Sequence, residues 1–330
     1  MDHTIDVPDR ERFTRCRRAW DFGSPLRRNL EPVPSGAPAG FGAALRAALA
    51  AYYYPAMWAW NRSLVRPIVA QTFTKAMAGT DPAVIAEGVA LLEAYAAWAP
   101  GVDDFTPVRT TDELRVVVGA PGRPGEGLLA PDGGGIHLQA TVDLVATDEH
   151  DRLWIVEHRL VEPGSDWAGA EVLALDSRAG TLCWVAEEQY VARVAGVLFT
   201  EIRRGRPAGA DGAGTGTAPE FRRTRVRKQP KELRQLRRQA AAELVAMLDP
   251  AVVLYPTPTP ANCGACAFKA PCLAMSAGDD PEPILAGGYR TAVPFTIPLP
   301  ERTGSLGPQR VIGWKTAGPG RSSLDDIPAR

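Results

Sequence analysis

Cysteine and net charge are both scarce in this chain of 330 residues. Only 5 cysteines occur, and 37 basic residues against 38 acidic residues leave a formal net charge of −1. A charge this close to zero gives no global field that would draw the chain toward nucleic acid or an anionic membrane. Hydrophobic residues make up 45% of the sequence, which is enough for one large domain or two modest domains with a core.

Long apolar runs are missing as well. The first 22 residues are polar and charged and contain no apolar h-region, so no secretory signal is expected. No stretch approaches the length of a membrane-spanning helix, and the most apolar run is interrupted by Arg46. We therefore expect a cytoplasmic protein without a membrane partner. Thiols stay reduced in that compartment, which favours a metal site over disulfides for any clustered cysteines.

Hydrophobic periodicity predicts the order helices, strand, hairpin, helix, strand, helix. Helices are expected over 9–20, 41–62, 82–98, 173–190 and 231–249, and strands over 113–118, 136–147, 152–158 and 192–204. The two middle strands form a hairpin around a turn at 148–151. This order predicts the α/β class, with a small mixed sheet wrapped by helical additions at both ends.

Two acidic residues on the expected hairpin, Asp143 and Glu157, form a candidate site. Antiparallel pairing places them opposite each other, within about 5 Å if both side chains point to the same face. Like charges at this distance repel unless a cation lies between them, and Mg²⁺ or Mn²⁺ binds carboxylates, carbonyls and water. Such an ion could activate water and stabilise charge on a phosphate. The alternative is two acids at the rim of a sheet, solvated or paired with arginine.

The segment TVDLVATDEHDRLWIVEHR resembles the motif of the PD-(D/E)XK nuclease superfamily, in its RecB-like branch. That motif has an aspartate on one strand, a hairpin, and Glu-x-Lys on the next strand. Asp143 matches the aspartate, Glu157 matches the glutamate, and Arg159 stands in place of the lysine. The family's first acid, upstream of the hairpin, corresponds loosely to Glu113. The resemblance implies a restriction-endonuclease-like core that hydrolyses DNA with Mg²⁺ or Mn²⁺ held by the acidic residues.

Other motif positions depart from the family. Arg46 stands where members carry a histidine in a Gly-x-x-x-His pattern, and Arg178 and Leu182 stand where members carry Gln-x-x-x-Tyr. Arginine keeps the charge of lysine but is bulkier and never deprotonates, although it binds phosphate bidentately. The changes indicate either reduced or lost catalysis, or a site at which Arg46, Arg159 and Arg178 converge on one phosphate.

The cysteines match the resemblance as well. One subset of RecB-like nucleases has an N-terminal cysteine and a C-x2-C-x5-C group after the core, which together hold a [4Fe–4S] cluster. Cys16, Cys263, Cys266 and Cys272 match that arrangement. Four thiolates suit either an iron–sulfur cluster or zinc, and unrelated free thiols are the third alternative. Cys183 lies within an expected helix and is interpreted as a small core residue.

A local basic stretch, Phe221–Gln239, contains nine Lys and Arg residues and one Glu. Arg234, Arg237 and Arg238 lie on neighbouring faces of one expected helix, which suits contact with a phosphate backbone. A solvated helix face explains the same pattern equally well.

These patterns predict four parts: an N-terminal segment with Cys16 and a linker (1–40), a nuclease-like domain (41–260), a cysteine segment closing on Cys16 (261–275), and a poorly ordered tail (276–330). The first hypothesis is a RecB-like nuclease that cleaves DNA single strands or ends. The second is a catalytically degenerate, DNA-binding or complex-forming subunit on the same fold. A zinc-stapled protein unrelated to nucleic acid is the third, and a helicase or a repair or defence partner stays open.

Overall fold

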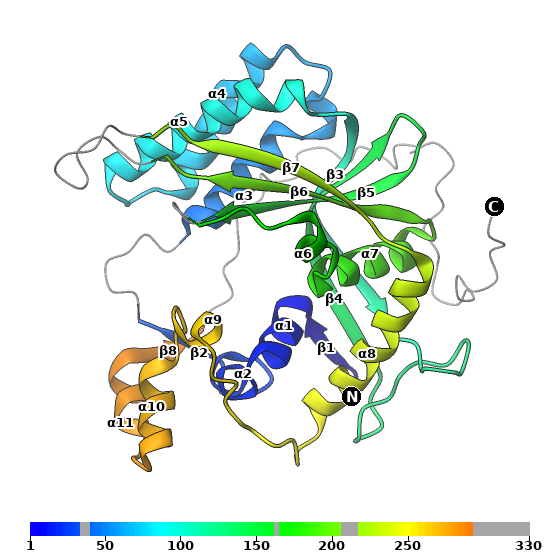
Figure 1. The fold of residues 1–330 in the computed structure, drawn as a ribbon, viewed down its shortest axis with the longest axis vertical. Helices are drawn as coiled ribbons and strands as arrows, with labels where there is room; N and C mark the ends of the chain where they lie inside the picture. The colour runs from blue at the N-terminus through cyan, green and yellow to red at the C-terminus, as the bar shows by residue number, and fades with distance from the viewer. Residues whose placement is uncertain (34–39, 162–164, 206–216, 293–330) are drawn as a thin grey trace.

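A mixed sheet forms the centre of the computed structural model, which describes residues 1–33, 40–161, 165–205 and 217–292 (Figure 1). The sheet has six strands in the order β1-β4-β5-β6-β7, with β3 paired to β4. The pairs β1–β4 and β5–β6 are parallel, and the other pairs are antiparallel. The strands are β1 (His3–Asp6), β3 (Phe105–Val117), β4 (Ile136–Asp148), β5 (Leu153–Val161), β6 (Val194–Arg203) and β7 (Glu220–Arg227). The expected α/β class with a mixed sheet flanked by helices is confirmed.

Strand β4 has partners along both edges, but one of its edges is shared between two strands. β3 pairs with β4 over most of its length, whereas β1 covers only residues 136–139 and β5 covers only residues 144–147. Residues 140–143 therefore lie in a gap between β1 and β5. The sheet divides at this gap, because β5 continues along β6 while β4 continues toward β1.

One face of the sheet is covered by a helical layer that Figure 1 shows above the strands. Phe73 from this layer packs so closely on Gly88 that a Cβ there would lie 2.1 Å from its ring. Glycine is therefore required at that helix crossing. Asp81 caps a helix by accepting a hydrogen bond from the Ala83 backbone N–H. The layer consists of α3 (Phe41–Tyr52), η1 (Pro55–Met57), α4 (Arg62–Ala76), α5 (Pro82–Trp98) and η2 (Ala99–Gly101).

The opposite face is covered by α1 (Val7–Arg15), α6 (Ala170–Ala174), α7 (Ser177–Tyr190) and α8 (Pro230–Leu248). Helices α6 and α7 connect the parallel strands β5 and β6, as such a crossover requires. Because β5 is covered on both faces, Leu153 to His158 are all buried. The main hydrophobic core lies between this layer and the sheet.

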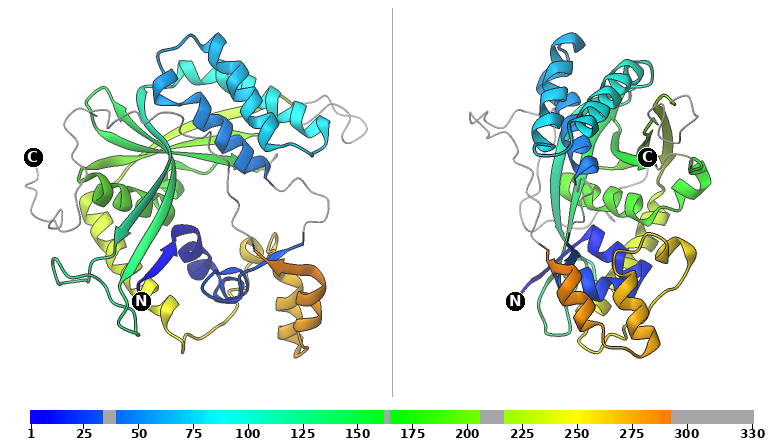
Figure 2. Two further views of the ribbon diagram at one scale, coloured as in Figure 1. Left: turned by 180° about the vertical axis from the view of Figure 1, so that it is seen from behind. Right: turned by 90° about the vertical axis from the view of Figure 1, so that its left-hand side faces the viewer.

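Segments from the two ends of the described chain form a small separate assembly, which Figure 1 shows at the lower left (Figures 1 and 2). Phe22 packs on Phe268, and β2 pairs antiparallel with β8. Ala19, Phe22, Phe268 and Leu285 form its buried cluster. Its elements are α2 (Arg17–Gly23), β2 (Leu30–Pro32), α9 (Pro260–Cys263), α10 (Lys269–Ala277), α11 (Glu282–Gly288) and β8 (Tyr289–Thr291).

The structure differs from the expected boundaries at both ends. The expected helix over 9–20 is two helices, α1 and α2, with Cys16 in extended conformation between them. The first strand and α1 belong to the main sheet and core, so residues 1–15 are not a separate segment. The poorly ordered tail expected from residue 276 instead contains α11 and β8, because Leu285 is buried and β8 pairs with β2. Residues 293–330 lie outside the described residues.

The sequence predicted no helix of membrane-spanning length, but the structure contains one. Residues Pro82–Gly101 are long and apolar enough to cross a membrane by length and composition alone. The core helix of a globular protein passes the same test, and here Leu91, Leu92 and Tyr95 are buried in the hydrophobic core between the helical layer and the sheet. The helix packs mainly against α3 and α4.

Candidate active site

Asp143 and Glu157 lie where β4 and β5 separate. The last pair of the β4–β5 ladder is Leu144 opposite Val156, and this register continued by one residue puts Asp143 opposite Glu157. The sequence predicted this arrangement. Because the ladder ends there, the two backbones no longer pair with each other, and the Asp143 side chain accepts a backbone N–H of β5 instead.

Asp143 is held by the residue that follows Glu157. Its Oδ2 accepts a hydrogen bond of 2.9 Å from the backbone N–H of His158 and lies 3.4 Å from the ring Nδ1 of that residue. Burial tends to raise the pKa of Asp143, but the contacts with His158 and the charge of Arg46 outweigh it and lower the pKa. The carboxylate is therefore ionised and fixed in orientation.

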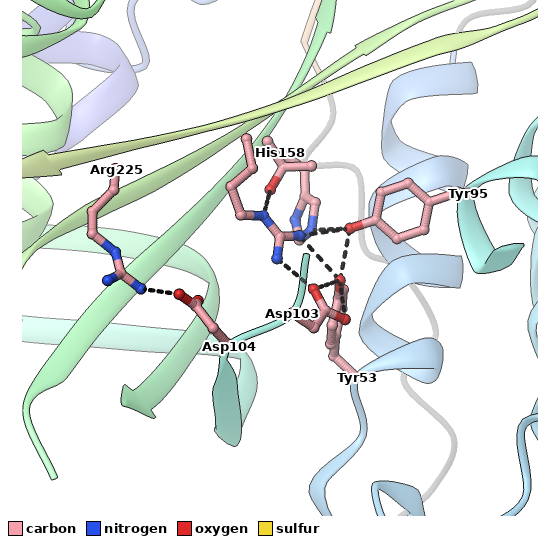
Figure 3. A network of polar contacts seen from close by, with 8 residues as sticks. Tyr53, Tyr95, Asp103, Asp104, His158 and Arg225 are labelled. Atoms are coloured by element: carbon pink, nitrogen blue, oxygen red, sulfur yellow. Dashed lines mark hydrogen bonds and ion pairs between the residues drawn. The ribbon is translucent and has the colours of Figure 1, made fainter. Parts of the chain in front are cut away.

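The ring of His158 lies on the face of the sheet opposite to Glu157, beside the helical layer. It packs at a tilt against Tyr53 and edge-on against Tyr95, and its Nε2 lies 3.5 Å from the Tyr95 hydroxyl (Figure 3). Tyr53 and Arg223 both bond to Asp103, which completes a buried polar network. The backbone N–H of His158 bonds to Asp143, so this residue links the buried network to the acidic pair.

Glu157 is the least satisfied acid of the site. It is 6% exposed, and its Oε1 accepts a 2.7 Å hydrogen bond from Nε of Arg178. Its Oε2 is buried and has no hydrogen-bond partner among the residues that the structure describes. Burial raises the pKa of Glu157, Asp143 raises it further, and Arg178 and Arg159 oppose the shift without cancelling it. A buried carboxylate oxygen without a partner is what a cation ligand needs.

Arg178, near the start of α7, lies between two glutamates from distant parts of the chain. Its Nη1 is 3.5 Å from Oε2 of Glu11, which α1 supplies, and its Nε contacts Glu157. Burial raises the pKa of Glu11, and nearby Asp176 adds to the rise. Sequence analysis missed Glu11, since only the packing of α1 on α7 brings it to the site. An open cleft of about 560 Å³ lies beside it, lined by Pro8, Glu11, Arg12, Thr14, Arg15 and Ser177.

Arg159 and Arg46 complete the surroundings of the acidic pair. Arg159 pairs with Asp176 at 2.8 Å and lies over the ring of Phe199 at 4.4 Å. Its charge acts on Glu157, and the charge of Arg46, an exposed residue of α3, acts on Asp143. Arg46, Arg159 and Arg178 therefore all act electrostatically on one or the other of the two carboxylates, and their convergence on one phosphate stays a prediction.

Glu113 is placed elsewhere. It lies on β3 opposite Thr141, accepts a hydrogen bond from Gln139, and acts electrostatically on Asp6. Within the described ranges no contact joins it to Asp143 or Glu157. The reason is topological, because β3 runs along the edge of β4 that faces away from β5.

Much of the basic stretch 221–239 is neutralised by acids. Its first part is strand β7, whose Arg222, Arg223 and Arg225 pair with Glu201, Asp103 and Asp104 (Figure 3 shows the last pair). On α8, Arg237 pairs with Glu187 and Glu188. Arg234 and Arg238 are exposed and have no ion-pair partner in the described part of the chain. Only these two of the three helix arginines stay available to a phosphate backbone.

The cysteine segments lie side by side but do not form a metal centre in the structure. Cys16 and Cys266 both pack on the cluster around Phe22 and Phe268, and Nη1 of Arg18 lies 3.6 Å from Sγ of Cys272. However, no group of three or more His, Cys, Asp or Glu side chains within the described ranges is arranged to hold a metal ion. Cys183 is fully buried in the main core, which agrees with its interpretation as a core residue.

Since no three possible metal ligands come together within the described ranges, the acidic site offers two carboxylates, Asp143 and Glu157. Glu157 offers its unpartnered Oε2, and Asp143 offers the oxygen that does not bond His158. Two carboxylate oxygens with water as the remaining ligands are a typical set for Mg²⁺ or Mn²⁺. The donors at the open end of the hairpin therefore fit a divalent ion, while three arginines nearby oppose its charge.

Comparison with protein-family models supports the superfamily that the sequence resembles. A model of the PD-(D/E)XK nuclease superfamily matches residues 9–273. The crystal structure of SSO0001 is 11% identical in sequence with a TM-score of 0.35, and the match covers 81% of this chain and 84% of that chain. No curated protein matches the chain significantly. Since the family model spans most of the sequence, the chain belongs to the PD-(D/E)XK nuclease superfamily.

Proposed function

We propose that the chain is a metal-dependent nuclease that hydrolyses phosphodiester bonds in DNA at Asp143 and Glu157. One observation supports this most directly: the buried Oε2 of Glu157 has no partner among the described residues and lies at the split of a nuclease-family sheet. A fold that only needed stability would pair such an oxygen or replace it with an apolar group.

Separate residues of the chain would bind the metal, orient a carboxylate and bind the phosphate. Asp143 and Glu157 would hold Mg²⁺ or Mn²⁺, which lowers the pKa of a bound water and stabilises charge on the phosphate. His158 orients the Asp143 carboxylate through its backbone N–H. Arg46 and Arg178 would bind the phosphate, for which the guanidinium group is suited by its bidentate geometry. Arg159 would stand in for the family lysine.

The finer assignments also belong to this proposal. The match of Asp143 and Glu157 to the RecB-like motif supports that branch, with single strands or ends as substrate. The C-x2-C-x5-C spacing and the contact between the Cys16 and Cys272 segments support a [4Fe–4S] cluster, with zinc as the alternative. A cytoplasmic location and a helicase or a repair or defence partner stay predictions.

Colour and metal content test the cluster. Protein purified without oxygen should be brown and contain iron if Cys16, Cys263, Cys266 and Cys272 hold the cluster. A colourless protein with stoichiometric zinc would favour zinc, and a metal-free protein would mean that the four thiols are independent.

A nuclease assay tests the main proposal. Wild type, Asp143→Ala and Arg159→Lys would be compared on labelled single- and double-stranded DNA, with Mg²⁺ and with Mn²⁺. Cleavage by wild type that disappears in Asp143→Ala is the expected result. It would also show that Arg159 can replace the lysine.

The ion pairs of the arginines favour one alternative, a degenerate subunit that binds DNA without cleaving it. Arg178 already bonds Glu157, and Arg159 already bonds Asp176, so both arginines are occupied within the protein. An inactive wild type with an active Arg159→Lys variant would indicate a decayed nuclease on an intact scaffold. Inactivity of all three proteins with retained DNA binding would establish the degenerate subunit.

A further inference from the structure

Arg178 places a fixed positive charge where the acidic site would bind a metal. Its guanidinium lies between Glu157, 2.7 Å from Oε1, and Glu11, 3.5 Å from Oε2. These contacts join α1, β5 and α7 around one cation. While Arg178 holds this position, its positive charge neutralises the Glu157 carboxylate without a divalent ion.

A divalent ion and Arg178 compete for the same carboxylate. An ion bound through Oε2 of Glu157 would lie within a few ångströms of the guanidinium, and two positive charges at that distance in a partly buried site repel strongly. This repulsion falls only if the Arg178 side chain moves away from Glu157. The side chain of Arg178 is 25% exposed, so it has a route outward.

Outward from Arg178 lies the cleft that Glu11 and Ser177 line together with Arg12 and Arg15. Arg178 does not line this cleft, but it follows Ser177 in the chain and its Nη1 lies 3.5 Å from Oε2 of Glu11, so a phosphate in the cleft would lie close to its guanidinium. Guanidinium binds phosphate through two parallel hydrogen bonds, as well as it binds a carboxylate. The cleft therefore offers Arg178 a second partner.

We propose that Arg178 couples the two binding events: it keeps a divalent ion off Glu157 until a backbone phosphate of a nucleic acid in this cleft draws it away. This inference rests on the proposed nuclease function. It makes the metal affinity of the free protein low and that of the nucleic-acid complex high, so that the site is complete only when substrate is present.

The chain contains a matched control for Arg178. Arg237 on α8 also bridges two glutamates, Glu187 at 3.6 Å and Glu188 at 2.9 Å, and its side chain is 20% exposed. It has no contact with the acidic pair. Replacing it removes the same charge and similar ion pairs at a distance from the site.

Mn²⁺ binding to the full chain tests the coupling without relying on catalysis. Free Mn²⁺ would be titrated by electron paramagnetic resonance in wild type, Arg178→Gln, Arg178→Lys and Arg237→Gln, each checked for cooperative melting. Arg178→Gln should bind Mn²⁺ at least about tenfold more tightly than wild type, since one competing charge is gone. Arg237→Gln should equal wild type. Arg178→Lys keeps the charge but cannot bridge both glutamates, so a smaller gain in Mn²⁺ affinity is expected. This variant tests the coupling if Arg178→Gln does not fold.

The second half of the experiment adds a short phosphorothioate DNA strand that resists cleavage. Wild type should then bind Mn²⁺ about tenfold more tightly, and Arg178→Gln should show little further gain. Equal Mn²⁺ affinity of wild type and both Arg178 variants would overturn the inference, and so would an equal gain in Arg237→Gln. If wild type cleaves DNA in the assay above despite this result, the proposed function stands and only the coupling fails. If none of the proteins binds Mn²⁺ or cleaves DNA, the proposed function is overturned, and the coupling with it.

Discussion

The two ends of the β4–β5 hairpin present the same kind of side chain in opposite states. At the turn, both oxygens of Asp148 are satisfied: they accept hydrogen bonds from the backbone N–H groups of His150 and Arg152 and from the side chains of Arg152 and Trp154. At the open end, Glu157 has one oxygen paired and the other without a partner in the described chain. Both acids are buried, yet the pKa of Asp148 is lowered and that of Glu157 is raised.

This difference separates structural acids from reactive ones. Burial raises the pKa of any carboxylate, and at Asp148 the four donors more than offset it. At Glu157 a single arginine does not offset burial and the neighbouring Asp143. A short sequence segment thus contains two buried acids that differ in how many donors the fold brings to them and in whether a second acid lies beside them.

The largest effect should come from removing the charge at the open end. Glu157→Gln should lower the rate of DNA cleavage by roughly a hundredfold to a thousandfold, because a bound metal supplies several kcal/mol of charge stabilisation. Its free energy of unfolding should change by about 1 kcal/mol or less, because glutamine keeps an oxygen that accepts the Arg178 hydrogen bond and Arg178 keeps its contact with Glu11. Single-turnover cleavage and urea unfolding measure the two quantities, and a variant that cleaves like wild type would contradict the assignment.

The matching change at the turn should do the reverse. Asp148→Asn should lower the free energy of unfolding by about 3 kcal/mol, since several hydrogen bonds to a buried charge are lost or reversed. Cleavage by the folded variant should stay within about twofold of wild type, because Asp148 does not touch the acidic pair. Urea unfolding measures the loss, and a stable but inactive variant would break the distinction between the two ends.

Arginines with and without partners extend the comparison to positive charges. The double variant Arg234→Gln/Arg238→Gln should weaken DNA binding about tenfold and reduce the salt slope of affinity by about two. Arg225→Gln, whose side chain pairs with Asp104 at 2.7 Å, is the control and should stay within about twofold. Fluorescence anisotropy at several salt concentrations measures both, and an equal loss in the control would mean that pairing does not decide which arginines bind.

The smallest effect concerns pH and Asp148 alone. Its pKa in the folded chain lies below the ordinary value of 3.8, so its stabilisation is complete above that pH and is lost as pH falls toward the folded pKa. The stability difference between wild type and Asp148→Asn should therefore be constant from pH 7 to about 5 and narrow below about 4. Unfolding curves between pH 7 and 3 check this, and parallel curves at all pH values would contradict the lowered pKa.

Local patterns predicted the hairpin and the helix over 82–98 well. Alternation over 136–147 and 152–158 and the turn between them correspond to β4, β5 and the Asp148 turn, and α5 has the expected bounds. These features depend on residues near one another in sequence, so the sequence is sufficient to predict them.

The missed features depend on distant packing or on misleading composition. Helix α4 contains Pro67, which breaks a helical pattern, and β7 has the arginine-rich sequence EFRRTRVR, which was interpreted as a basic patch. Its arginines are stabilised by acids on other elements, such as Glu201 and Asp103. Glu11 reaches the site only through the packing of α1, for which no spacing rule exists.

The pairing of β2 with β8 has a consequence for how the chain is made. Arg290 bonds Glu31 across 259 residues, and Phe268 covers Phe22 at the same place. A ribosome that adds about 5–20 residues per second therefore exposes the first half of this assembly for roughly ten to fifty seconds before its partner emerges. During that interval the residues around Cys16 are open to the surroundings, which is the period in which a cofactor, a chaperone or an unwanted partner can reach them.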